Sequence, residues 1–179
     1  MFPLVAGSAL VFSACGFQLR GEQNFAFKRL AVVGGPPPFT ARLTRMVEGG
    51  SDSVVVESPT NADAVLHVSE VRNFSTLTLN QFGSVVEYQV NYWLNYSLVS
   101  ADGTLLIKPS TIALNRAMTY SDQYSTAKTQ EADLLFADMQ NDAVDQLMRR
   151  LAVLKTLTPT PDQVVPGVAP VAPLPPPPL

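Results

Sequence analysis

Residues 85–99 show the most regular alternation of apolar and polar side chains in the chain. Apolar or aromatic residues occupy every even position from Val86 to Leu98, and polar residues occupy the odd positions apart from Trp93. This alternation is typical of a strand with one buried and one solvated face in an antiparallel sheet. We therefore expect a long strand here, followed by a tight hairpin turn at Asp102-Gly103.

Other segments share the strand periodicity. Residues 64–79 alternate with a change of apolar phase, which predicts a bulge or bend near Glu70 to Asn73, because a one-residue slip moves side chains to the opposite face. Residues 105–120 also alternate, and Pro109 within them predicts an edge position or a bulge, since proline cannot donate a ladder hydrogen bond. Shorter strands are predicted at 26–33 and 53–57.

Two segments have a helical period instead. Residues 38–48 carry apolar side chains on one face, follow prolines and end before Gly49-Gly50, which predicts a short amphipathic helix. Residues 129–154 carry a longer apolar stripe, with Thr129 as the expected N-cap and Gln140 among the outward-facing side chains. The order of elements predicts an α+β fold, in which a mostly antiparallel four- to five-stranded sheet is covered by two helices.

The two ends of the chain differ in composition from the region between them. Residues 2–14 are uncharged and mostly apolar, too short to span a bilayer and suited to the hydrophobic region of a signal peptide. Residues 156–179 contain nine prolines and one charged residue, which favours an extended, mobile tail. We expect a signal segment at 1–14, one domain at 15–155 and a proline-rich tail at 156–179.

Cys15 is the single cysteine of the chain and directly follows the apolar segment. Ser13 and Ala14 precede it, and small residues before a cysteine look like the lipobox at which bacterial lipoproteins are cleaved and acylated. On this interpretation Cys15 is the first mature residue and carries a covalent lipid that tethers the domain to a membrane. The alternative is a buried or free thiol behind an ordinary export signal.

Composition narrows the chemistry that the chain can perform. The formal net charge is −3 with acids and bases interspersed, which does not indicate nucleic-acid binding. The single histidine, His67, lies in a predicted strand, so we interpret it as structural rather than as a general base. The sequence contains neither a phosphate loop nor a nucleophile-elbow motif. We expect a protein that is not an enzyme and that needs no metal or cofactor beyond the lipid on Cys15.

Three motifs resemble the family of the lipopolysaccharide (LPS)-assembly lipoprotein LptE. They are CGFQLRG at 15–21, VEYQV at 86–90 and AVDQLMRRL at 143–151. The resemblance implies an outer-membrane lipoprotein of Gram-negative bacteria, anchored on the periplasmic side. It also implies a protein that plugs the LptD β-barrel, helps it to assemble and takes part in delivering LPS to the cell surface. Gly16, which is not Asp, fits transport onward to the outer membrane.

A plug needs a surface that matches a polar barrel lumen. The odd face of the 85–99 strand is one candidate, and an ordinary solvated sheet face is the alternative. LPS is anionic, so contact with it favours cations on one side of the fold, for which Arg116, Lys108 and Arg72 are the candidates. Scattered solubilising charge is the alternative for these residues. For the whole chain, the alternative is a lipid-anchored periplasmic scaffold or a lipoprotein that binds a small ligand.

Overall fold

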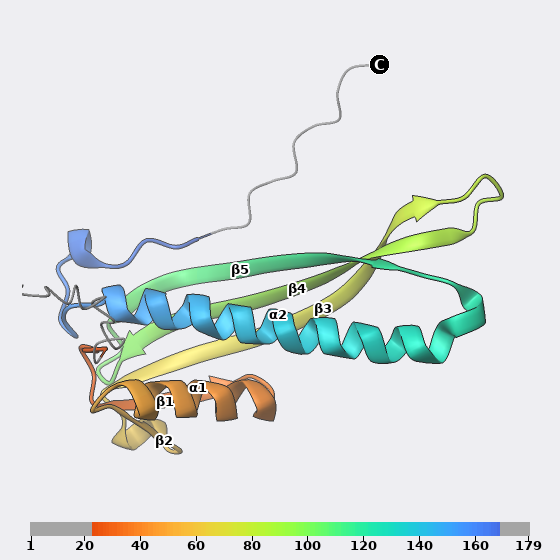
Figure 1. Ribbon diagram of the computed structural model, residues 1–179. Coiled ribbons are helices and arrows are strands. Elements are labelled where there is room, and N and C mark those ends of the chain that lie inside the picture. The colour runs from red at the N-terminus through yellow and green to blue at the C-terminus, as the bar shows by residue number, and fades with distance from the viewer. Residues whose placement is uncertain (1–22, 169–179) are drawn as a thin grey trace, which may run out of the picture.

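Five strands form one mixed sheet, and two long helices cover one of its faces (Figure 1). A computed structural model describes residues 23–168. The strands are β1 (Arg29–Gly34), β2 (Val54–Val56), β3 (Ala64–Leu79), β4 (Val85–Ser100) and β5 (Leu105–Thr119), and the helices are α1 (Pro37–Gly50) and α2 (Ser125–Val153). The predicted fold class is therefore confirmed.

The strand order is β2-β1-β3-β4-β5. β1 is parallel to both of its neighbours, while β3, β4 and β5 form an antiparallel meander. The parallel pair β1–β2 arises because α1 carries the chain back across the sheet between them, as parallel strands require. The buried side chains of both helices and of the even positions of β4 form one hydrophobic core, which includes Phe39, Leu43, Tyr92, Leu94 and Leu147.

The bulge predicted near Glu70 to Asn73 is wrong. β3 pairs with β4 residue by residue through this region, and the register shifts lie between Thr76 and Leu79. The apolar phase changes because the side chain of Glu70 faces the helices, where it accepts a hydrogen bond from α2, while Val71 is exposed on the other face. The bend in the hairpin consequently lies near its tip (Figure 1).

The sequence predicted that Pro109 lies in an edge strand or at a bulge, and both are observed. β5 is an edge strand, and its register with β4 shifts between Ile107 and Ser110. The start of α2 was not predicted correctly, because the helix begins at Ser125. The hydroxyl of Thr129 donates to the carbonyl of Ser125 at 3.1 Å within the helix and does not cap it.

Residues 160–168 depart from the extended, mobile tail that the prolines predict. A short helical turn at Pro161–Gln163 is followed by Val165, which is buried and forms a parallel bridge with Ile107 of β5. The N–H of Thr111 donates to the carbonyl of Val168 at 2.7 Å. The valines between the prolines supply both apolar side chains and backbone donors. A count of prolines alone does not reveal these contacts. Residues 169–179 lie outside the described residues.

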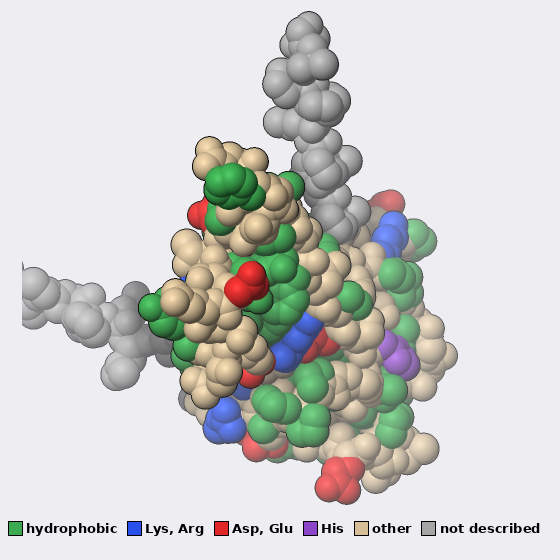
Figure 2. All heavy atoms as spheres, turned by 90° about the vertical axis from the view of Figure 1, so that its right-hand side faces the viewer, with side chains coloured by type: hydrophobic (Ala, Val, Ile, Leu, Met, Phe, Trp, Pro, Cys, Tyr) green, Lys and Arg blue, Asp and Glu red, His purple; other side chains and the backbone are tan. Residues whose placement is uncertain are grey.

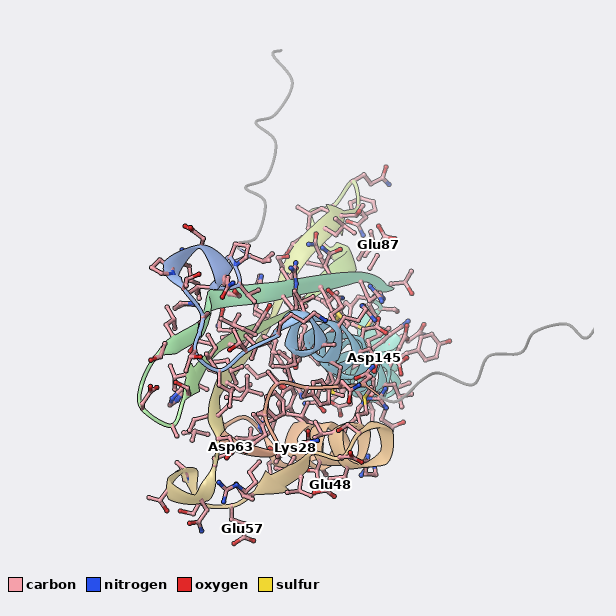
Figure 3. All side chains as sticks on the ribbon, turned by 90° about the vertical axis from the view of Figure 1, so that its left-hand side faces the viewer. Lys28, Glu48, Glu57, Asp63, Glu87 and Asp145 are labelled. Atoms are coloured by element: carbon pink, nitrogen blue, oxygen red, sulfur yellow. The ribbon has the colours of Figure 1, made fainter. Side chains whose placement is uncertain are left out.

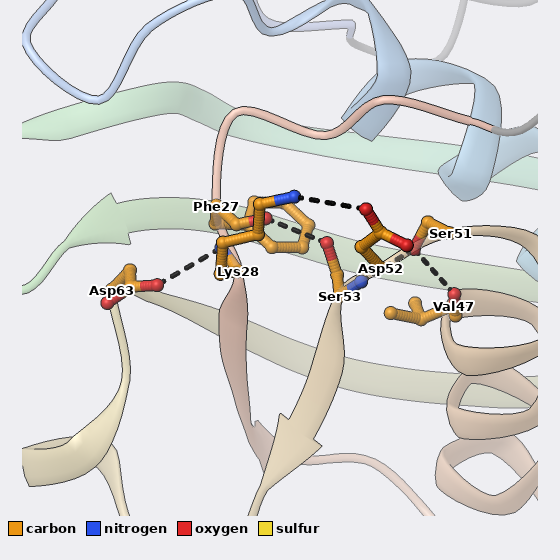
Figure 4. Close-up of polar contacts among 7 residues, drawn as sticks. All are labelled: Phe27, Lys28, Val47, Ser51, Asp52, Ser53 and Asp63. Atoms are coloured by element: carbon orange, nitrogen blue, oxygen red, sulfur yellow. Dashed lines mark hydrogen bonds and ion pairs between the residues drawn. The ribbon is translucent and has the colours of Figure 1, made fainter.

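Asp63 ties the start of β3 to the start of β1, at the end of the molecule seen in Figure 3. Its Oδ2 accepts the backbone N–H of Lys28 at 3.1 Å (Figure 4) and the backbone N–H of Arg29 at 2.9 Å. The guanidinium of Arg29 donates to Oδ1 at 2.7 Å. The hydrogen bond from the Arg29 side chain, supported by those from the backbone, lowers the pKa of the Asp63 carboxyl against the opposing effect of desolvation.

Asp63→Asn is expected to lower the free energy of unfolding at neutral pH by about 1 kcal/mol, because the amide is a weaker acceptor than the carboxylate. The folded-state pKa of Asp63 lies below the unfolded value of 3.8, so its stabilisation is present above that value and is lost as pH falls through the folded pKa. Urea unfolding of both proteins over a pH series should show the difference shrinking towards acid pH.

Asp52→Asn is the matched control for Asp63→Asn. The carboxylate of Asp52 makes only an exposed ion pair with Lys28 at 3.7 Å, so its replacement should change stability little (Figure 4). A difference between wild type and Asp63→Asn that stays constant with pH would show that the carboxylate does not act through its charge.

Candidate functional site on the open face of the sheet

The three predicted cationic residues do not share one surface. Arg116 and Arg72 lie on the helix-covered face of the sheet, on β5 and β3, the two strands that flank β4. Nη2 of Arg116 donates to Asp142 of α2 at 2.8 Å. Lys108 is exposed at the β5 bulge and has no ion pair within residues 23–168. Binding of LPS by these residues remains a prediction.

Arg72 belongs to a polar network beneath α2. Its guanidinium pairs with Glu70 and lies 5.3 Å from the ring centroid of Phe136. The carboxylate of Glu70 also accepts the hydroxyl of Tyr92 at 2.8 Å and the amide of Gln140 at 2.7 Å. Burial, with the hydrogen bond to Glu70, raises the pKa of Tyr92 far above its ordinary value. The network fastens α2 to the sheet.

Gln140 is oriented differently from the prediction. It was expected to face outward, but it is buried because its amide reaches Glu70 across the interface between helix and sheet. The helical period alone does not show that a polar side chain at the border of the apolar stripe has a buried acceptor opposite it.

The face of the meander opposite the helices is free of them, and we call it the open face (Figure 1). Its side chains come from the odd positions of the three strands. They are His67, Ser69, Val71, Asn73 and Ser75 of β3, Gln89, Asn91, Trp93, Asn95 and Ser97 of β4, and Thr111, Ala113, Asn115 and Ala117 of β5. None of these side chains is Lys, Arg, Asp or Glu. The next odd position of β4 towards the hairpin tip, Glu87, adds one carboxylate at the end of this face.

Hydrogen bonds between strands hold the amide side chains of the open face. Nδ2 of Asn91 donates to Oδ1 of Asn73 at 3.1 Å and to Oγ of Ser75 at 3.0 Å. The amide of Gln89 donates to Oδ1 of Asn91 at 2.9 Å. The contacts of Asn91 with β3 cross between strands, whereas Gln89 and Asn91 both belong to β4. Together they fix the positions of the donors and acceptors that the face presents.

Trp93 lies at the centre of the open face. Its strand neighbours are Val71 and Ala113, so one apolar row crosses an otherwise polar surface. Tryptophan is over-represented among the residues that contribute most to protein–protein binding. Sequence periodicity identified Trp93 as the exception in its strand but gave no neighbours for it.

A shallow depression of about 500 Å³ lies between Val33 and Val168 on the same face. His67 lines it and is exposed, with Ser97 opposite on β4. Within residues 23–168, no group of His, Cys, Asp and Glu side chains is arranged to hold a metal ion. None of the helices in that range is both long and apolar enough to cross a membrane.

Comparison with known proteins gives a consistent match. The family model described as LptE: Lipopolysaccharide-assembly matches residues 27–151. The LPS-assembly lipoprotein LptE of Pectobacterium atrosepticum is 30% identical over 163 residues, covering 86% of each chain. The protein of the same name in Yersinia enterocolitica is 25% identical, over 84% of this chain and 74% of the relative.

A solved structure shares the arrangement of strands and helices. The solution structure of uncharacterized lipoprotein B from Nitrosomonas europaea has a TM-score of 0.65 and is 27% identical, covering 77% of this chain and 91% of its own. The fold, the family model and the relatives agree over the same part of the chain. The chain therefore belongs to the LptE lipopolysaccharide-assembly family.

Proposed function

We propose that this chain is an outer-membrane lipoprotein that occupies the lumen of an LptD-type β-barrel, helps that barrel to assemble and takes part in LPS delivery. Family membership supports a role in LPS assembly, and relatives with substantial coverage carry the name LPS-assembly lipoprotein. Membership also bears out the expectation that the protein is neither an enzyme nor dependent on a cofactor.

The open face is the observation that carries the barrel proposal. The interior wall of an outer-membrane barrel is polar. A face of amide and hydroxyl groups can exchange hydrogen bonds with water for hydrogen bonds with such a wall, and it avoids the larger cost of desolvating ions. The amide groups of Asn73 and Asn91 are already held in position, which reduces the entropy lost on binding. Trp93 supplies an apolar anchor at the centre of the contact.

The proposed membrane anchor lies outside the described residues. Acyl chains on Cys15 would contribute roughly 0.8 kcal/mol for each buried methylene, enough to hold the domain at the periplasmic side of the outer membrane. The lipid then determines the membrane to which the protein is bound, while the open face determines its binding partner.

Ala113→Arg tests the open face. Ala113 is exposed beside Trp93, so the substitution should leave the fold intact and place an unpaired cation in the contact. We expect recovery of the barrel protein with the affinity-tagged chain, after mild detergent extraction, to fall by about tenfold, which corresponds to 1.4 kcal/mol. Quantitative immunoblotting of both proteins measures the ratio.

Ala127→Arg is the matched control, since Ala127 is exposed on α2, away from the open face. It should recover as much barrel protein as the wild type. Equal recovery with Ala113→Arg would remove the open face from the contact. Purification of the wild-type chain free of any barrel protein would instead favour the alternative of an independent periplasmic scaffold.

A further inference from the structure

A second hollow lies at the end of the molecule where the β3–β4 hairpin turns away from α2 (Figure 1). Its volume is about 390 Å³, within the range of about 300–1,000 Å³ that ligand pockets occupy. Figure 2 looks onto this end and shows hydrophobic side chains gathered there. The apolar part of the lining consists of Phe74, Tyr88, Met118, Tyr120, Ala132 and Phe136.

The pocket forms because the β3–β4 hairpin bends away from α2 near the N-terminal end of that helix. The register shifts after Thr76 turn the hairpin aside, so α2 no longer covers the strands fully. Phe74 consequently stays 48% exposed although it lies on the helix-covered face, where its ring meets Phe136 at 5.4 Å between centroids. Tyr88 packs edge-on against both Phe74 and Tyr120, so the walls are rigid rings in fixed positions.

Polar groups in the lining come from the first turns of α2. They are the side chains of Ser125, Lys128, Thr129 and Asp133. Nζ of Lys128 donates to Thr119 at 3.0 Å and to Glu131 at 2.7 Å, so its charge is already compensated. Asp133 is exposed and forms no ion pair within residues 23–168. A ligand of this pocket therefore needs an apolar body, and the lining offers no uncompensated cation to an acidic group.

Exposed apolar side chains also lie on the hairpin beyond the pocket. Leu77, Leu79 and Phe82 are exposed, Phe82 to 81%, and they lie on the part of the hairpin that leads away from the pocket to its tip. A compact ligand would leave this surface uncovered, whereas a long, flexible chain can fill the pocket and extend along it. Each methylene removed from water favours such binding.

We infer that this pocket binds an acyl chain of LPS, with the polar part of the lipid remaining outside at the start of α2. The inference rests on the proposed role in LPS delivery, because an amphiphile handled outside a bilayer needs cover for its chains. The site is separate from Arg116 and Lys108, which do not line the pocket.

The test uses the full chain with Cys15→Ser, exported behind a cleavable signal, so that no acyl chain of its own competes. Dansyl-labelled undecanoic acid is the probe, and its fluorescence reports binding. We expect intact LPS to displace it, and LPS stripped of its acyl chains by alkali to leave it bound. Thr129→Trp, which fills the mouth of the pocket from an exposed position, should weaken probe binding about tenfold, the cost of about two unburied methylenes.

Gln130→Trp is the matched control, because Gln130 is the next residue on α2, is exposed and does not line the pocket. It should bind the probe as the wild type does. Equal binding by Thr129→Trp, or displacement by phospholipid as effective as by intact LPS, would overturn the inference. Recovery of the barrel protein with Thr129→Trp separates the two proposals, since it stays at the wild-type level even if the pocket fails.

Discussion

Gly34→Ala is expected to destabilise the fold by about 3 kcal/mol or more. Gly34 ends β1 with φ +82°, a left-handed conformation that costs an alanine about 1–2 kcal/mol. In addition, a Cβ at this position would lie 2.2 Å from the carbonyl oxygen of Val68 on β3. Relief of that overlap requires β1 and β3 to move apart, which disturbs their parallel hydrogen bonds. Urea denaturation followed by circular dichroism measures the loss.

Gly83→Ala separates the two causes. Gly83 has φ +81°, almost the same as Gly34, but a Cβ there would meet nothing within 4 Å. It should therefore cost only the conformational part, about 1–2 kcal/mol. If the two substitutions cost the same, the close approach of β1 and β3 does not constrain the residue at position 34.

Glu70→Ala is expected to cost a similar amount, about 3 kcal/mol. The side chain of Glu70 is 10% exposed, and its loss leaves the hydroxyl of Tyr92 and the amide of Gln140 without an acceptor beneath α2. It also leaves Arg72 without its ion pair. The unfolding transition should move to lower urea concentration, with α2 losing protection from amide hydrogen exchange first.

Glu131→Ala provides the comparison for an exposed carboxylate. Glu131 pairs with Lys128 in α2 but is 45% exposed, so its removal should cost less than about 1 kcal/mol. Replacing both Glu70 and Gln140 by leucine should recover part of the loss, because the amide of Gln140 is then no longer buried without an acceptor, while the hydroxyl of Tyr92 and the guanidinium of Arg72 still lack their partner. A Glu70→Ala protein as stable as Glu131→Ala would show that water replaces the network without cost.

Hydrophobic periodicity predicted the elements of this fold and the buried face of β4. The predicted bounds of β3, residues 64–79, are also confirmed. It could not show that β1 pairs in parallel with β3, since that pairing depends on how α1 packs. The predicted bulge was misplaced because Glu70 and Arg72 are charged but face the core. In the sequence alone, charged residues at core-facing positions look like a slip of register.

The candidate site was predictable in part. The polar odd positions of β4 were visible in the sequence, whereas the neighbours that complete the open face depend on register across the three strands. A signal for the network beneath α2 was present, because Glu70 and Arg72 share the parity of Leu66 and Val68. Arg116 stands among apolar positions for a related reason, since its side chain reaches Asp142 on α2. The pocket follows from the bend of the hairpin, which no local pattern reports.

The bridge between Val165 and Ile107 also bears on how molecules of this protein meet one another. An outermost strand offers free N–H and C=O groups on which a second molecule can add its own strand, the first step of edge-to-edge aggregation. Residues 165–168 occupy those groups along part of β5, beside Pro109, which has no N–H to offer. Because residues 165–168 belong to the same chain as β5, dilution does not weaken their contact with it. Each molecule therefore has this part of its edge strand covered before it meets a second molecule.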